Sequence, residues 1–206
     1  MKENYSDKCD EILNNLTSTK KILLHSCCAP CSSYVISYLT NYFDITILYY
    51  NPNIFPYEEY IKRKEEQIRL INEIESKNKL DIIDCEYDNE KYTNLIKGLE
   101  TEPERGTRCN ICYEMRMEKT AEIAKNKKYD YFCTTLSVSP YKNSTLINQI
   151  GEKLEKKYNI KWLYSDFKKK DGYKKSIELS KKYNLYRQNY CGCIYSKPIL
   201  FHIVNE

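Results

Sequence analysis

KILLHSCCAPC (21–31) combines an apolar run with three closely spaced cysteines. Residues 21–26 are mostly aliphatic, as is typical of a buried β-strand. Cys27, Cys28 and Cys31 follow this run directly. The stretch therefore predicts a strand whose end carries thiols to one edge of a sheet.

Strand-like and helix-like segments alternate along the whole chain. Further strands rich in Ile, Leu, Tyr and Phe are predicted at 44–50, 80–86, 129–136 and 160–166. Amphipathic helices are predicted at 57–77, 115–126, 144–158 and 173–183. Within 57–77, Ile61, Ile68, Ile71 and Ile74 are expected to lie near one face. This alternation favours a Rossmann-like α/β fold, a mostly parallel sheet with helices on both faces, with an α+β fold as the alternative.

The composition is that of a soluble protein with a real core. The chain has 206 residues, 41% of them hydrophobic and 30% charged, which predicts a single domain spanning 1–206. The opening MKENYSDKCDEILNN has no apolar core of a secretory signal, and no apolar run approaches the roughly 20 residues of a membrane span. We therefore expect a cytoplasmic protein without membrane association. The net charge of +4 permits a nucleic-acid partner without requiring one.

Unusual residues follow four of the predicted strands. They are Cys27 and Cys28 after the first strand, 51–53 (NPN) after the second, 137–140 (SVSP) after the fourth and Asp166 after the fifth. Ligands of open α/β sheets bind beyond the carboxyl ends of the strands. These residues therefore predict one shared site at that edge of the sheet.

The cysteines point to metal or redox chemistry. Seven of the ten fall in three tight groups, CCAPC (27–31), CNIC (109–112) and CGC (191–193). A reducing cytosol does not maintain structural disulfides, so clustered thiols there are more often metal ligands or redox catalysts. The C-x-x-C spacing pairs Cys28 with Cys31 and Cys109 with Cys112, which suits zinc or an iron–sulfur cluster. A zinc staple, a reactive cluster and metal-free thiol chemistry all remain open at this point.

The CGC group at Cys191 and Cys193 has a different potential. A disulfide closed across one glycine departs from relaxed geometry and is therefore easily reduced, which suits a two-electron role. The alternatives are two further metal ligands or an inert pair. By contrast, the isolated Cys85 and Cys133 lie in strand patterns and are expected to be small buried residues. His25, in the first strand, is expected to be a hydrogen-bonded core histidine.

Five blocks of the sequence together resemble the QueH-type epoxyqueuosine reductase family. In order, they are LLHSCCAPCS, YYNPNIFPYEEYIKRKEE, RCNICYEMRMEKTAEIA, FCTTLSVSPYKN and LYRQNYCGCIYS. The resemblance runs from about Lys21 to Ser196 and so covers nearly the whole chain. It implies reduction of epoxyqueuosine to queuosine in the anticodon loop of a tRNA, without cobalamin. The electron donor is not specified by any of these residues.

The resemblance also implies a [4Fe-4S] cluster and allows a further iron ion beside it. Its ligands would be Cys27, Cys28, Cys109 and Cys112, and the redox-active pair would be Cys191 and Cys193. The resemblance thus selects Cys27 where spacing alone selects Cys31, and Cys31 is left as a ligand of the further iron or a neighbouring thiol. Asp166 is a candidate carboxylate ligand for that iron.

A tRNA partner predicts recognition of single-stranded bases by stacking and phosphate contacts. Candidate residues are Tyr141, Tyr186, Arg187 and Tyr190. Two rival functions are a zinc-stapled RNA-binding module and a metal-free thiol oxidoreductase. A third, a sulfur-transferring tRNA enzyme, would carry an SGGxDS-like ATP loop after the first strand, where this chain has SCCAPCS.

Overall fold

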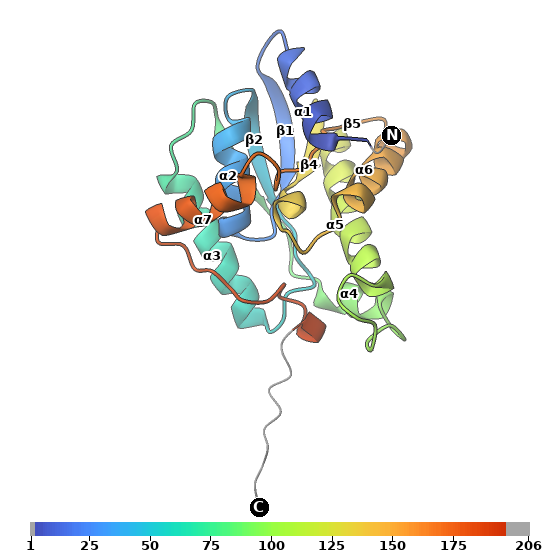
Figure 1. Cartoon of the computed structure of the whole chain (residues 1–206). Coiled ribbons are helices and arrows are strands. Elements are labelled where there is room, and N and C mark those ends of the chain that lie inside the picture. Colours follow the sequence, from blue (N-terminus) through green and yellow to red (C-terminus); the bar gives the residue numbers. More distant parts are fainter. Residues whose placement is uncertain (1–2, 197–206) are drawn as a thin grey trace, which may run out of the picture.

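The computed structural model describes residues 3–196, which form a five-stranded parallel sheet between two layers of helices (Figure 1). The strands are β1 (Lys20–His25), β2 (Phe43–Tyr49), β3 (Leu80–Asp84), β4 (Tyr131–Thr134) and β5 (Lys161–Trp162). Their order is β3-β2-β1-β4-β5, and every neighbouring pair is parallel. All five predicted strands and the Rossmann-like fold are confirmed, although β4 and β5 are shorter than predicted.

Helices cover both faces of the sheet. They are α1 (Tyr5–Asn14), α2 (Ala29–Leu39), α3 (Tyr57–Glu73), α4 (Asn89–Leu95), α5 (Thr107–Asn126), α6 (Ser144–Tyr158) and α7 (Gly172–Lys182). One layer holds α2 and α3, with α7 packed on α2, and the opposite layer holds α5 and α6 (Figure 1). The four predicted helices are confirmed, α5 beginning eight residues before its predicted start at 115. Over residues 3–196, every helix is too short or too polar to span a membrane.

The buried face of α3 includes polar residues that the isoleucine pattern did not predict. The residues of α3 that face the protein are Tyr60, Arg63, Gln67 and Leu70, whereas Ile68 is exposed. Gln67 is buried because its Oε1 accepts hydrogen bonds from the hydroxyls of Ser26 at 2.6 Å and Ser32 at 2.8 Å. Ile74 is buried, and Ile61 and Ile71 are partly buried against the core, so the predicted isoleucine face is confirmed except at Ile68.

The order of the strands locates the site. From β1 the chain passes through α2 on one face to β2, whereas from β4 it passes through α6 on the other face to β5. The carboxyl ends of β1 and β4 are adjacent, since His25 pairs with Thr134. The two crossovers diverge at this point, and an open α/β sheet leaves a ligand-binding crevice where they do so.

Candidate active site

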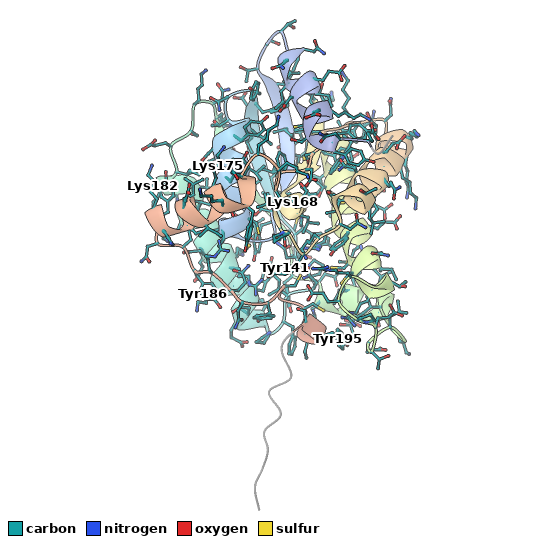
Figure 2. The ribbon with its side chains drawn as sticks, viewed as in Figure 1. Tyr141, Lys168, Lys175, Lys182, Tyr186 and Tyr195 are labelled. Carbon is teal, nitrogen blue, oxygen red and sulfur yellow. The ribbon has the colours of Figure 1, made fainter. Side chains whose placement is uncertain are left out.

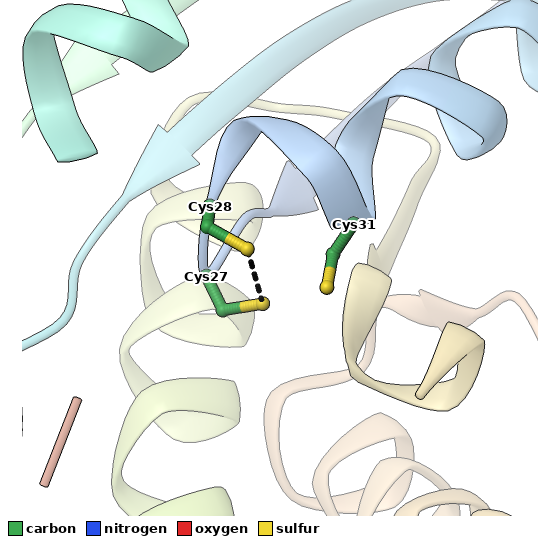
Figure 3. Close-up of side chains that lie close together, drawn as sticks. All are labelled: Cys27, Cys28 and Cys31. Atoms are coloured by element: carbon green, nitrogen blue, oxygen red, sulfur yellow. Dashed lines mark hydrogen bonds between the residues drawn. The ribbon is translucent and has the colours of Figure 1, made fainter. Parts of the chain in front are cut away.

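Three thiols meet at the N-terminus of α2. Cys28 is the residue that precedes the helix, and Cys27 and Cys31 flank it (Figure 3). The sulfurs of Cys27 and Cys28 are 3.8 Å apart, and all three lie within 4.8 Å of one another. Two thiolates on one tetrahedral metal with 2.3 Å bonds would be about 3.8 Å apart. The helix N-terminus also favours negative charge on the sulfurs.

One negative charge is stabilised within this group of three thiols. Hydrogen bonds from Cys28 and Cys31 hold the pKa of Cys27 well below its ordinary value. The same interaction with Cys27 raises the pKa of Cys28 to about 12. The group can therefore present one thiolate without any bound ion, and a cation would allow more than one.

The CNIC thiols lie on the first turns of α5. Cys112 is buried, and Cys109 is partly exposed and accepts a hydrogen bond from the backbone N–H of Arg105 at 3.3 Å. Neither belongs to the 4.8 Å group, which is the single such group of potential metal ligands among residues 3–196. A four-iron cluster takes each thiolate on a different iron and so holds its ligands farther apart than a single ion does.

Arg116 of α5 places a buried positive charge among thiols from three segments. Its side chain is 1% exposed, and its pKa is raised because Cys112, Cys191 and Cys27 outweigh the effect of burial. Its Nε donates to the backbone carbonyl of Cys112 at 3.1 Å, and its Nη1 donates to Oδ1 of Asn51 at 3.4 Å. Its Nη2 is buried without a hydrogen-bond partner, and no carboxylate within residues 3–196 pairs with it. A buried cation is costly unless an anion offsets it, so the site is built to hold negative charge.

These groups line one cavity, which we call the thiol cavity. Its volume is about 410 Å³, within the size range of small-molecule sites. Cys27, Cys28, Cys31 and Cys191 contribute sulfur to its wall. The cations in the wall are Arg63, Arg116, Lys142 and Arg187. Thiols from the first and last sequence blocks thus share one compartment. Of the strand-end residues predicted to share a site, Cys27, Cys28 and part of 137–140 line this cavity, whereas 51–53 and Asp166 do not.

The CGC segment is held over this cavity by α3 and the loop before it. Gly192 has a φ of +106°, and a Cβ there would lie 2.9 Å from both Nη1 of Arg63 and Cγ1 of Ile54. The carbonyl of Gly192 accepts a hydrogen bond from the backbone N–H of Phe55 at 2.9 Å. Glycine is therefore required at the centre of this motif for both conformation and space.

Four other residues singled out in the sequence do not line the thiol cavity. His25 is fully buried, with Nδ1 2.8 Å from the Thr134 hydroxyl and Nε2 3.2 Å from the Tyr50 carbonyl, and burial lowers its pKa to about 3. This confirms a neutral core histidine. Cys133 is buried within β4 as predicted, whereas Cys85 is partly exposed just after β3. Asp166 pairs with Lys168 at 2.7 Å and lines a different cavity, which none of the cysteines of the CCAPC, CNIC and CGC groups lines.

Of the aromatic candidates for base stacking, some line the thiol cavity and one does not. Tyr141 is 62% exposed and lines the thiol cavity, as do Arg187 and Tyr190. Tyr141 and Tyr186 both lie in the lower half of the molecule in Figure 2, where the C-terminal segment runs. The ring of Tyr186, however, is covered by Lys62, whose Nζ is 3.7 Å from the ring centroid.

The cations and the hydroxyl beside the thiols were not predicted from the sequence. These are Arg63, Arg116, Lys142 and Tyr92, and nothing distinguishes them locally from the other lysines, arginines and tyrosines of this chain. The one signal was the position of Arg63 between Tyr60 and Gln67, at the three- and four-residue spacing of a buried helix face.

Comparison with known proteins identifies the family. The model of the family described as epoxyqueuosine reductase QueH matches residues 22–198. The epoxyqueuosine reductase QueH of Staphylococcus epidermidis is 47% identical over 180 residues, which cover 85% of this chain and 76% of the relative. That of Streptococcus pyogenes is 44% identical, covering 85% and 69%, and that of Thermotoga maritima is 36% identical, covering 85% and 89%.

Among solved structures, the fold is similar to that of the U34-tRNA thiolase NcsA from Methanococcus maripaludis, determined with its [4Fe-4S] cluster. The TM-score is 0.57 at 14% sequence identity, with 94% of this chain and 67% of that chain covered. At this identity the likeness concerns the fold alone. The family match and the identities to the bacterial reductases, in contrast, extend over most of the sequence, and the chain therefore belongs to the QueH family of epoxyqueuosine reductases.

Proposed function

We propose that this enzyme reduces epoxyqueuosine to queuosine in the anticodon loop of tRNA with a [4Fe-4S] cluster and the dithiol of Cys191 and Cys193. Family membership supports the reaction. The observation that carries the redox part is the shared wall of the thiol cavity, where Cys191 faces the same space as Cys27, Cys28 and Cys31. A reductant and a metal-binding group would thus act on one bound nucleotide.

Cys27, Cys28, Cys109 and Cys112 are the proposed ligands of the cluster. The donor set fits in charge, because within residues 3–196 the Nη2 of Arg116 has neither a hydrogen-bond partner nor a carboxylate beside it, and a thiolate-bound cluster is anionic. When bound, the cluster would supply single-electron transfer, and an iron beside it would supply Lewis acidity. Cys31 is close enough to Cys27 and Cys28 to ligate that iron.

The dithiol accounts for the electron count. Removing the epoxide oxygen to leave an alkene takes two electrons and two protons, and the oxygen departs as water. Closing a disulfide between Cys191 and Cys193 breaks two S–H bonds, forms one S–S bond and releases two electrons and two protons. An external reductant must then reopen the disulfide before the next turnover.

The walls of the thiol cavity supply the features expected for a single-stranded nucleotide. Tyr141 and Tyr190 offer aromatic faces for base stacking, and Arg187 offers a cation for a phosphate. A base withdrawn from the anticodon loop would reach the thiols past these side chains. This arrangement favours an enzyme over a structural zinc module, which has no use for a dithiol.

The test is conversion of tRNA that contains epoxyqueuosine, followed by mass spectrometry of its nucleosides under anaerobic conditions with dithionite as reductant. Wild-type protein is expected to produce queuosine. C191S and C193S are expected to produce none while keeping the visible absorbance of the cluster, whereas C85S serves as an active thiol control. Turnover by C191S and C193S at the wild-type rate would contradict the role of the dithiol.

A further inference from the structure

The two sulfurs of the CGC motif lie in different environments. Cys191 is partly exposed and lines the thiol cavity, whereas Cys193 is 7% exposed and does not line it. A molecule in the cavity can therefore reach the sulfur of Cys191 first. The motif is asymmetric although its two cysteines are chemically identical.

Each sulfur also has its own partner from another part of the chain. The Nζ of Lys142 donates a hydrogen bond to the sulfur of Cys191 at 3.3 Å. The hydroxyl of Tyr92 lies 3.1 Å from the sulfur of Cys193. An ammonium group has donors only, so it favours an anionic sulfur as acceptor. Burial raises the pKa of Cys193 and of Tyr92, so both of these groups retain their protons.

Lys142 has no carboxylate to neutralise it within residues 3–196, and its Nζ lies 5.3 Å from the ring centroid of Tyr113. Burial alone would lower the pKa of Lys142, but Cys191 and Tyr113 raise it, and the net direction is upward. The ammonium therefore stays charged, and the sulfur of Cys191 accepts its hydrogen bond.

We propose that Lys142 is a positioning residue that holds Cys191 as the thiolate of the redox pair and thereby makes Cys191 the reacting sulfur and Cys193 the protonated reserve. This inference rests on the proposed function of the dithiol. In the oxidation step, the Cys191 thiolate and the Cys193 thiol form the S–S bond, and two electrons pass to the epoxide. One proton comes from Cys193 and the other from solvent, and both leave with the oxygen as water, while Lys142 keeps its charge.

Other ionisable groups act on Cys191 as well. They are Cys112, Tyr113 and Arg116 of α5, Cys193, and Arg63 of α3, which binds the backbone carbonyl of Cys191. All of them are retained in variants of Lys142. A comparison of such variants therefore isolates the effect of this one ammonium group.

The test measures alkylation of Cys191 by iodoacetamide as a function of pH, read by mass spectrometry of the peptide that carries it. The proteins are anaerobically purified and reduced wild type, K142M and K142R. For K142M, we expect the midpoint of Cys191 alkylation to rise by about one pH unit or more, because a cation within hydrogen-bonding distance is lost. K142R keeps the charge and is expected to remain close to wild type.

Alkylation of Cys193 is the internal control, and it should be slow in all three proteins because Cys193 is buried. Equal midpoints for wild type and K142M would overturn the inference, as would faster labelling of Cys193 than of Cys191. Because alkylation needs no tRNA, this result is separate from the proposed activity. Wild-type protein that shows the expected midpoints yet leaves epoxyqueuosine unchanged would refute the proposed function alone.

Discussion

Arg63 of α3 donates a hydrogen bond through Nη1 to the backbone carbonyl of Cys191, at 3.1 Å and across 128 positions of sequence. The same guanidinium pairs through Nε with Glu59 at 2.7 Å, and only 2% of its side chain is exposed. A buried, ion-paired arginine has little freedom to move. It therefore fixes the backbone of the CGC motif against α3 and sets where the Cys191 sulfur stands in the thiol cavity.

Replacing Gly192 by alanine is expected to abolish activity, because the new Cβ would lie 2.9 Å from Nη1 of Arg63. G98A is the matched control, since Gly98 also has a positive φ, +86°, but a Cβ there meets nothing within 4 Å. Both variants should lose about 1–2 kcal/mol of stability from backbone strain. Thermal unfolding and queuosine formation would be measured together. An active G192A would show that the close contact between Arg63 and the CGC backbone is not required for activity.

Replacing Arg116 by methionine removes the buried cation that faces thiols from three segments. We expect R116M to retain less iron than wild type and its cluster to have a more negative reduction potential, because the reduced state gains negative charge that the guanidinium of residue 116 no longer offsets. R116K keeps the charge and should lie between the two. Iron analysis and potentiometry give the readouts, and a wild-type potential in R116M would show that its charge does not act on the cluster.

The role of Cys31 can be separated from that of Cys109. The resemblance assigns Cys109 to the cluster, whereas the structure places Cys31 beside Cys27 and Cys28. We expect C109S to lose most of its iron and sulfide, and C31S to retain the cluster and lose at most one iron. The two variants would be compared by iron and sulfide content after anaerobic purification. Loss of the whole cluster from C31S alone would reverse the assignment.

Much of this fold is predictable because buried parallel strands have an unmistakable composition. All five strands were predicted, whereas α2 was not, since both polar and apolar residues of that helix are buried, Ser32 and Ser33 beside Val35 and Ile36. Without one solvated face, it lacks the amphipathic period that indicates a helix. The face of α3 was predicted incompletely for a related reason, as Arg63 and Gln67 share its buried side and Ile68 is exposed.

The site was predictable only as far as its thiols. Clustered cysteines are rare enough to stand out, and the position of Cys27 and Cys28 after the first strand predicted that they line a site at the edge of the sheet. Arg116 and Lys142 did not stand out, because 33 lysines and arginines fill this sequence and a buried cation looks the same as a solvated one. Their role depends on contacts such as that between Lys142 and Cys191, which join residues 49 positions apart.

The segment that carries the CGC motif is also anchored by Glu66. Its carboxylate accepts hydrogen bonds from the backbone N–H of Tyr186 at 2.5 Å and from Arg69 at 2.8 Å, and Arg69 is the main cause of its lowered pKa. A lowered carboxyl pKa contributes stability that is present above the ordinary value of 4.5 and is lost as pH falls through the lowered value.

E66Q should therefore be less stable than wild type at pH 7, by about 1 kcal/mol, and the difference should shrink as the pH falls below 4.5. Hydrogen exchange in 184–193 should also become faster in E66Q. E73Q is the control, because Glu73 also pairs with Arg69 but is more exposed. A stability difference that is unchanged between pH 7 and pH 3 would exclude this linkage.

If thiolates of the CCAPC and CNIC blocks together bind an iron–sulfur cluster, the metal content of the protein must show it. Purified without oxygen, the wild-type chain is expected to be brown and to hold about four iron and four sulfide per molecule. Stoichiometric zinc in a colourless protein, with no iron or sulfide, would contradict the claim.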